Sequence, residues 1–371
     1  MNKKIYSRIL FGILAAVLLP VTHSAFAGND TKKGSAGAVE LLINPWAAST
    51  GLAGANTASV RGIESSNLNI AGLAWLAKEG NPGGEVSVCG TRYLSGSNIS
   101  MFALGYGQKI GETGAMGINV VALNLGDFLE TTFSQPEGTG NSFTPNYFNI
   151  GAGYSKVFSS SVSAGIMVRL INHTLPRASA TDFGIDGGVQ YSKNGFRFGV
   201  AMRNWGPKTF YSGEGMIVKG TINNDQNRYG LSLSNNSAQF EMPSQFNVGA
   251  GYDFTLAAEH RLSPSANFTS NSFTQDQIQV GAEYAFQEKF MFRAGYIIQN
   301  NMFSESQATD VALGPCAGVG FYLPFSQVNS RDDDGKVSLP GLSNTVLGFN
   351  YSYRATRYFD GHHSIGVSLG F

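Results

Sequence analysis

The sequence is poor in charged residues, and positive and negative charges balance. Only 13% of its 371 residues are charged and the net charge is zero, whereas an ordinary soluble protein carries about a quarter charged residues to keep its surface wetted. A surface that lies partly in lipid needs fewer charges. Binding to nucleic acid would require a basic excess, which the chain lacks. The composition therefore favours a membrane protein and argues against a nucleic-acid partner.

Cysteines and long apolar runs are also scarce. Cys89 and Cys316 are too few for a disulfide framework. They fall on predicted strands that are not neighbours, so we expect two small buried thiols rather than a bridge. Beyond the amino terminus, no run of about twenty apolar residues occurs. This excludes a helical membrane protein and leaves a β-barrel as the membrane fold.

Patterns for catalysis or metal binding are weak. Residues 366–370 formally match the G-x-S-x-G nucleophile elbow, but that motif needs a strand-to-helix turn and a later histidine, and the sequence stops at residue 371. The histidines lack zinc spacing, and residues 332–335 lack the alternate acids of a calcium loop. We expect no enzyme activity, no metal and no cofactor.

The amino terminus predicts export. Lysines at positions 3 and 4 and an arginine at position 8 precede an apolar run, and Ala25 and Ala27 flank Phe26 in the small-x-small pattern of a cleavage site. We interpret residues 1–27 as a secretory signal peptide, which is excluded from the fold. No cysteine follows the cleavage site, so a lipid anchor is not expected there.

From residue 85 onward the sequence repeats a single theme. Segments of about ten residues alternate between apolar and small or polar side chains and are separated by turns, as in residues 246–254. The pattern predicts about fourteen strands, near residues 85–93, 98–108, 114–124, 146–157, 160–171, 182–191, 195–204, 244–254, 258–268, 276–287, 290–299, 312–322, 344–354 and 362–371. An even number of strands is typical of a bacterial outer-membrane β-barrel. A large soluble β-sandwich is the alternative.

The connections between these strands alternate in length. Short links would be periplasmic turns, and the long ones at residues 125–145, 205–243 and 300–311 would be external loops. The link at residues 323–343 should be periplasmic but is long. Tyr and Phe gather near strand ends, Phe290 and Tyr322 among them, where aromatic rings suit the lipid–water boundary.

The carboxy-terminal strand fits the same pattern. Because side chains alternate across a strand, Ile365, Val367, Leu369 and Phe371 would face lipid, while the small residues between them face the lumen. The final aromatic residue resembles the signal that the bacterial barrel-assembly machinery reads. We therefore predict an assembly signal in this strand, with that machinery as a partner.

A set of charged residues falls on the small or polar face of the predicted strands. Facing lipid, each would cost a few kcal/mol near the bilayer midplane, so we place them in the lumen. They could hold a luminal segment in place or line a ligand path. The set comprises Arg169, Arg197, Arg203, Asp253, Glu283, Arg293 and Arg354.

Residues 35–79 do not have the strand pattern and are rich in Ala, Gly, Leu and Asn. An apolar stretch leads to Asn-Pro, a Gly-x-x-Gly-Ala turn follows, and an Asn-x-Ala-Gly-Leu box comes later. The residues concerned are Asn44, Pro45, Gly51, Gly54, Ala55, Asn69, Ala71, Gly72 and Leu73. This arrangement resembles the opening of the PorV/PorQ proteins, which belong to the FadL-like group of outer-membrane barrels. Ile70 stands where that family more usually has proline.

The resemblance implies an all-β fold, a transmembrane antiparallel barrel over residues 85–371. Residues 28–84 would form a plug inside the lumen, since a barrel of this size is too wide for its own side chains to fill. A flexible periplasmic tail is the alternative for this segment.

The resemblance also implies a function in type IX secretion of Bacteroidota and their relatives. An integral outer-membrane protein of this kind would bind the carboxy-terminal domains of secreted cargo and shuttle the cargo between translocon and attachment complex. Loops 125–145 and 205–243 would then contact cargo or other secretion components. The alternative is a FadL-like transporter of hydrophobic small molecules, which a deep apolar pocket next to residues 41–46 and a kinked strand would favour.

Overall fold

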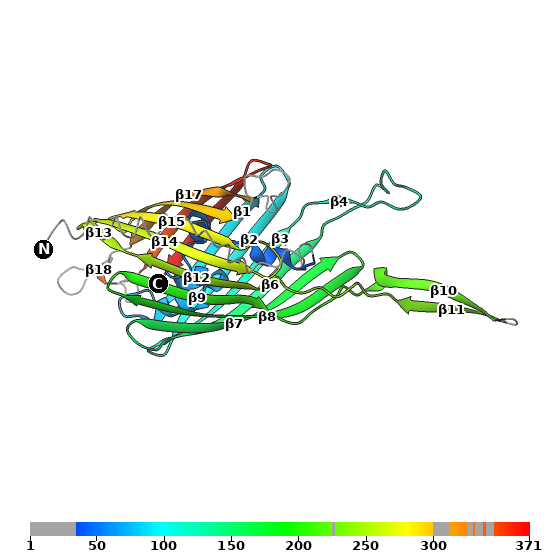
Figure 1. Ribbon diagram of the computed structural model, residues 1–371, viewed down its shortest axis with the longest axis horizontal. Coiled ribbons are helices and arrows are strands. Elements are labelled where there is room, and N and C mark those ends of the chain that lie inside the picture. The colour runs from blue at the N-terminus through cyan, green and yellow to red at the C-terminus, as the bar shows by residue number, and fades with distance from the viewer. Residues whose placement is uncertain (1–34, 225–226, 300–311, 325–328, 331–336, 339–344) are drawn as a thin grey trace, which may run out of the picture.

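The computed structural model describes residues 35–224, 227–299, 312–324, 329–330, 337–338 and 345–371 (Figure 1). The predicted signal peptide lies outside these residues. So does most of the 323–343 link, of which the short strands β18 (Asn329–Ser330) and β19 (Val337–Ser338) are described and pair with each other.

The predicted strands form one antiparallel sheet that closes on itself. The sheet order starts at β12 and ends at β13, and β12 also pairs with β14, which closes the ring. β12 and β13 are two parts of one strand interrupted at Asp253, so the barrel has fourteen strands as predicted. They are β1 (Gly84–Tyr93), β2 (Ile99–Ile110), β3 (Gly114–Asn124), β6 (Asn146–Val157), β7 (Val162–Leu175), β8 (Ala178–Lys193), β9 (Phe196–Trp205), β12 (Gln245–Tyr252) with β13 (Phe254–Ala257), β14 (His260–Asn271), β15 (Gln277–Phe286), β16 (Phe290–Gln299), β17 (Ala312–Pro324), β20 (Val346–Thr356) and β21 (His362–Gly370).

The period of two sorts side chains between lipid and lumen. On β2, Met101 and Ala103 are buried inside the barrel, whereas Phe102 and Leu104 point outward and are 49% and 42% exposed. Apolar side chains that face outward suit the hydrocarbon of a bilayer, and closure leaves the backbone without open edges. Within the described residues, no helix is long and apolar enough to span a membrane.

Two hairpins project from one end of the barrel (Figure 1). β4 (Phe128–Leu129) pairs with β5 (Ser142–Phe143), and β10 (Ile217–Asn224) pairs with β11 (Asn227–Ser234). The sequence pattern predicted only loops for both segments. The opposite end carries short turns, which in outer-membrane barrels face the periplasm. We therefore call the two ends the hairpin end and the periplasmic end.

Residues 35–83, here called the luminal segment, pack against the inner wall. Their helical elements are η2 (Val39–Leu42), α2 (Ala47–Gly51), η3 (Gly62–Asn67) and η4 (Ile70–Ala77). Ile63, Leu73 and Leu76 are fully buried and cluster with Met167 of β7. Small residues permit this close packing: a Cβ on Gly72 would lie 2.2 Å from a backbone oxygen of Val60.

The two cysteines are buried free thiols, as predicted. Cys89 lies on β1 and Cys316 on β17, and β21 and β20 separate these strands. Cys89 packs with Trp46 and Ala47 of the luminal segment.

Candidate functional site

A cavity of about 440 Å³ lies beside the luminal segment at the periplasmic end and is here called the vestibule. The wall strands supply one side and the luminal segment supplies the other. Its main polar and aromatic lining residues are Arg197, Arg261, Glu283, Glu288, Arg293 and Tyr322 from the wall, with Arg61, Glu64 and Trp75 from the luminal segment.

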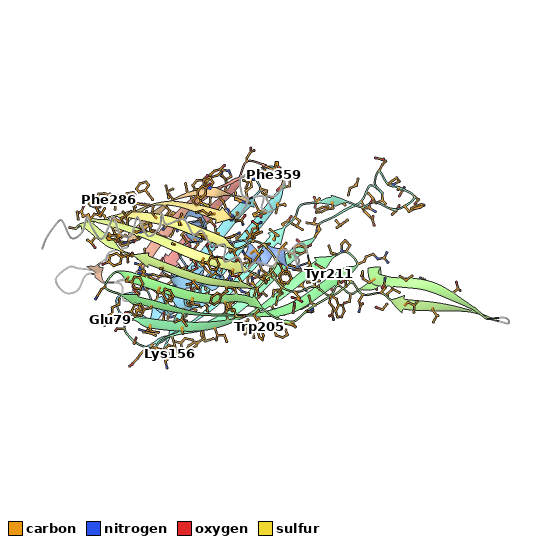
Figure 2. All side chains as sticks on the ribbon, viewed as in Figure 1. Glu79, Lys156, Trp205, Tyr211, Phe286 and Phe359 are labelled. Carbon is orange, nitrogen blue, oxygen red and sulfur yellow. The ribbon has the colours of Figure 1, made fainter. Side chains whose placement is uncertain are left out.

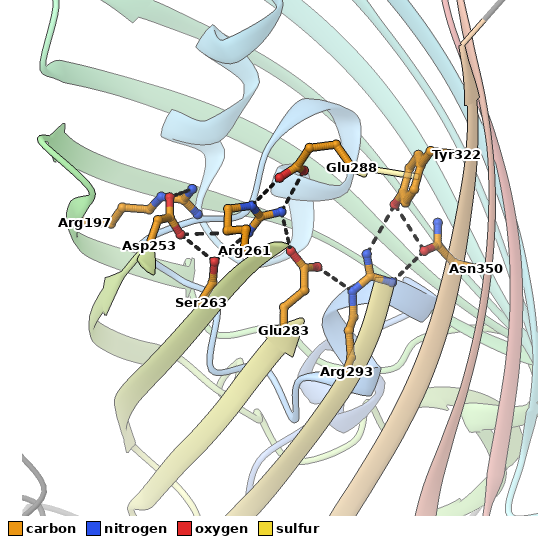
Figure 3. A network of polar contacts seen from close by, with 9 residues as sticks. All are labelled: Arg197, Asp253, Arg261, Ser263, Glu283, Glu288, Arg293, Tyr322 and Asn350. Carbon is orange, nitrogen blue, oxygen red and sulfur yellow. Dashed lines mark hydrogen bonds and ion pairs between the residues drawn. The ribbon is translucent and has the colours of Figure 1, made fainter. Parts of the chain in front are cut away.

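A belt of ion pairs lines the wall of the vestibule (Figure 3). Glu283 of β15 lies directly across from Arg293 of β16, and the Glu283 Oε2 to Arg293 Nε distance is 2.8 Å. Glu283 Oε1 also accepts a hydrogen bond from Arg261 Nη2 at 3.1 Å, and Arg261 Nε lies 2.6 Å from Glu288 Oε1. Shared carboxylates of this kind offset the cost of taking several guanidinium groups out of bulk water.

The belt continues in both directions along the wall. Arg197 of β9 pairs with Asp253, whose other oxygen accepts a hydrogen bond from the Ser263 hydroxyl at 2.6 Å. On the other side, Arg293 Nη1 donates to Asn350 Oδ1 at 2.7 Å, and the Tyr322 hydroxyl donates to the same oxygen at 3.1 Å. Side chains of β9, β14, β15, β16, β17 and β20, together with Asp253 between β12 and β13, are thus joined by direct contacts.

Four of the seven predicted lumen charges, Arg197, Asp253, Glu283 and Arg293, meet in this belt. Sequence reasoning missed Arg261 and assigned Tyr322 to the lipid–water boundary, which is wrong. Tyr322 shares the inward face of β17 with Gly318 and Gly320, and its hydroxyl points to Arg293. The period of two along β17 could have placed it correctly, because Phe321 takes the outward position.

Arg169 forms a separate, fully buried contact. Its Nε lies 2.6 Å from Asp186 Oδ2 across β7 and β8, and both side chains are at most 5% exposed. Arg169 Nη2 also donates to the backbone oxygen of Ser66 in η3. Asp186 was not predicted, and Asn204 N donates to its second oxygen at 2.7 Å. This group joins the luminal segment to the wall.

The other two predicted charges lie toward the hairpin end, at a polar cavity of about 90 Å³. Arg203 donates to Gln245 Oε1 at 2.9 Å and to the backbone oxygen of Leu41 at 3.2 Å. Arg354 lies directly across from His362 and has no ion-pair partner within the described ranges. Near this end, His173 Nε2 contacts Glu40 Oε1 of η2 at 2.7 Å.

The predicted plug residues lie in the luminal segment. Asn69 caps η4, since its Oδ1 accepts from Ala71 N at 3.2 Å, and its Nδ2 donates to the backbone oxygen of Val189 on β8 at 3.1 Å. Asn44 Oδ1 accepts from Trp46 N at 3.0 Å. Gly54 is half-buried and adopts φ +75°. The other predicted plug residues are buried: Pro45, Gly51, Ala55, Ala71, Gly72 and Leu73.

β21 pairs with β1 on one side and β20 on the other, so it lies at the seam where the first and last strands meet. Ile365, Val367, Leu369 and Phe371 point outward and are between 39% and 63% exposed. Backbone groups of Phe371 exchange two hydrogen bonds with Gly84, at 2.7 and 2.9 Å. Recognition of this strand by the assembly machinery stays a prediction.

Four ionisable side chains of the luminal segment line the periplasmic cavities without a hydrogen bond or ion pair to any described residue: Arg61, Glu64, Lys78 and Glu79. Burial and the nearby Glu85 raise the pKa of Glu64 to about 7. Enclosure by the barrel and the neighbouring Arg197 lower the pKa of Arg61 to about 10. Within the described residues, no group of three or more His, Cys, Asp or Glu side chains could hold a metal ion.

Comparison with protein families gives one match. Residues 94–326, which cover most of the barrel, match the family described as type IX secretion system membrane protein PorP/SprF. The chain belongs to the PorP/SprF family. The PorV/PorQ resemblance is therefore supported only at the coarser level of type IX secretion membrane proteins, because the matching family is a different one.

Solved structures share the fold of this PorP/SprF protein. The CymD monoaromatic hydrocarbon channel aligns with a TM-score of 0.53 and 15% identity, over 89% of this chain and 98% of that one. The Pseudomonas putida toluene transporter TodX aligns with a TM-score of 0.51 and 13% identity, over 88% and 97%. At this identity the likeness shows the fold, a closed β-barrel, and no ligand. A search of curated proteins found no match.

Proposed function

We propose that this PorP/SprF protein is a docking component of a type IX secretion system. In this proposal it binds the carboxy-terminal domains of secreted cargo at the hairpin end and passes cargo between translocon and attachment complex. Other secretion components would bind the same exposed surface. Family membership supports the secretion system, and the projecting hairpins support a binding surface outside the membrane.

The observation that carries the proposal is the β10–β11 hairpin. Of the described strands, only β11 pairs with β10, so both outer edges of this ribbon are open. Val218 and Leu233 pair directly on one face and are 52% and 56% exposed, and Leu231 on the same face is 37% exposed. A two-stranded ribbon is only marginally stable alone, and open edges accept a further strand. A partner with an available β-strand would satisfy the backbone and cover the apolar face.

The β4–β5 hairpin adds a second exposed apolar surface. Phe128 stacks on Phe143 with ring centroids 5.9 Å apart, and Phe133 between the two strands is fully exposed. Figure 2 shows the side chains of both hairpins standing clear of the barrel, and Tyr211 marks the base of the longer hairpin. Exposed aromatic residues are typical anchors of protein interfaces.

Replacing residues 217–234 with a short Gly-Ser linker tests the proposal. We expect the variant to insert into the outer membrane and to keep the heat-dependent gel mobility of a folded barrel. Cargo and translocon proteins should co-purify with the tagged wild type from detergent-solubilised membranes, and this recovery should fall at least tenfold for the variant. Replacing residues 129–142 in the same way measures the contribution of the other hairpin. Equal recovery after both replacements would contradict the proposal.

Transport of hydrophobic small molecules is the second candidate function, and the described structure does not favour it. The cavity next to residues 42–44 holds about 90 Å³ and is lined mainly by amide, hydroxyl and charged side chains. The register of β3 with both β2 and β6 continues without a bulge, whereas the β8–β9 register shifts between Ile185 and Gly187 and the β17–β20 register shifts between Ala312 and Cys316. The shared fold with hydrocarbon channels remains its support. Loss of hydrocarbon uptake in a deletion strain would revive this function.

A further inference from the structure

A second cavity of about 220 Å³ adjoins the vestibule at the periplasmic end, here called the serine pocket. It lies between the luminal segment and the ends of β7, β8 and β9. Arg61, Trp75 and Arg197 line both cavities, so the two spaces lie side by side. Figure 2 places Glu79, which lines the rim of the serine pocket, at this end of the barrel.

Hydroxyl groups line the serine pocket without partners. Ser59 comes from the luminal segment, and Ser161, Ser163 and Ser192 come from the wall. None of these four hydroxyls makes a hydrogen bond to another residue in the described part of the chain. Each hydroxyl can donate one hydrogen bond, so together they offer several donors to a bound group.

Positive charge gathers around the same hydroxyls. Lys78 and Arg61 have no ion pair within the described ranges, and Arg197 already pairs with Asp253. Burial, followed by the charges of Arg61 and Arg197, lowers the pKa of Lys78. Of the described residues that line the pocket, Glu79 alone carries a carboxylate, and its side chain is exposed; Asp253 and Glu283 act on Arg61 from outside the lining. Repulsion between these cations would be relieved by an anion among them.

We propose that the serine pocket binds the carboxylates of an acidic peptide segment that enters the barrel from the periplasmic side. Lys78 and Arg61 would contact the carboxylates, the serine hydroxyls would donate further hydrogen bonds, and Trp75 would provide an apolar surface for the peptide chain. The adjoining 440 Å³ of the vestibule gives space for a chain rather than a single small anion. This site is independent of the hairpin surface, because it lies at the opposite end of the barrel.

The test uses the full-length protein in detergent and three probes. These are acetyl-tri-aspartate amide, acetyl-tri-asparagine amide of matched length, and inorganic phosphate. Calorimetry measures affinity, and tryptophan fluorescence reports occupancy through Trp75, which the Trp75→Phe variant verifies. We expect tri-aspartate to bind at least tenfold more tightly than tri-asparagine or phosphate, and high salt to weaken it.

Two variants identify the site. Arg61→Gln and Lys78→Gln should each weaken tri-aspartate binding about five- to tenfold, since each removes a charge-assisted contact. Lys156→Gln is the matched control, because Lys156 is exposed on the wall and does not line the serine pocket. All three should keep the gel mobility of a folded barrel. Equal affinity for the two peptides, equal affinity for phosphate, or an unchanged affinity in the Arg61→Gln, Lys78→Gln double variant would overturn the proposal.

Discussion

Glu64 illustrates the cost of placing an ionisable side chain inside the barrel. It lies on η3 at the vestibule, without a hydrogen bond or ion pair to a described residue. Burial and the negative charges of Glu85 and Glu283 disfavour its carboxylate, while Arg293 favours it, and the pKa rises from 4.5 to about 7. The charges of the wall therefore offset the cost of burying the Glu64 carboxylate only in part. The carboxylate of Glu283, by contrast, is paired with arginines.

This pKa predicts a specific pH dependence of stability. The folded protein binds the Glu64 proton up to about pH 7, whereas the unfolded chain releases it near pH 4.5. Stability should therefore fall as pH rises between these values, and the full penalty applies above pH 7. Glu64→Gln removes the penalty, so its free energy of unfolding should exceed that of the wild type by about 1–2 kcal/mol at pH 8.

Urea unfolding in detergent at pH 5, 6, 7 and 8 measures the effect. The advantage of Glu64→Gln should shrink toward pH 5. Glu112→Gln serves as the control, since Glu112 is exposed in a periplasmic turn. A constant difference between Glu64→Gln and wild type across this range would show that the pKa of Glu64 is not raised.

At the scale of elements, the Arg169 contact holds η3 against β7 and β8. Arg169 and Asp186 are buried, so removal of one partner leaves a charge without compensation. We expect Asp186→Asn to lower the free energy of unfolding by about 3–5 kcal/mol. The double variant Arg169→Met, Asp186→Leu should recover much of that loss, because it removes both charges.

Unfolding by heat or urea in detergent, followed by gel mobility, measures both variants. Lys208→Gln gives the comparison with an exposed pair: Lys208 is 59% exposed where it contacts Glu241, and its loss should cost at most about 1 kcal/mol. A loss of similar size in Asp186→Asn and Lys208→Gln would contradict the assignment of a structural anchor.

The sequence predicted the wall well and the interior less well. Strand positions follow from the period of two, because lipid and lumen impose opposite demands on successive residues such as Phe102 and Ala103. β7 and β8 extend beyond their predicted bounds, to Leu175 and from Ala178, because they continue past the apolar zone at the hairpin end. The partners of the lumen charges were not predictable in the same way. Asp186 and Arg261 contact partners on neighbouring strands. Which residues lie opposite each other there depends on the register of the strands, which the period of two does not give.

The two hairpins at the hairpin end were not predicted, because the composition of their segments is typical of loops. β10 and β11 alternate in character, but they lie in a segment rich in Asn, Gly and Ser and are interpreted as loop by composition. The free cations Arg61 and Lys78 were also not singled out, because only the folded luminal segment brings them to one pocket.

At the scale of the whole molecule, the two candidate functions differ in whether the luminal segment must move. A docking protein can keep it in place, whereas a transporter must displace it. Ala47 of α2 and the native Cys89 of β1 both lie 3.6 Å from the position that a Cβ on Gly366 would occupy, and they share one core cluster. A cysteine at position 47 would lie in the same cluster as Cys89, and whether the two thiols form a disulfide in the oxidising periplasm is measured directly.

Where this bond forms, the Ala47→Cys variant fixes α2 to the wall. We expect cargo secretion at the wild-type level when the bond is formed, because external docking requires no movement of α2. Gel mobility with and without reductant, combined with alkylation of free thiols, measures the extent of the bond in cells. The Ala47→Ser variant is the control for the substitution itself. Secretion that stops when the bond forms and resumes on reduction would show that the luminal segment moves during function, and would replace a docking mechanism with one that opens the barrel.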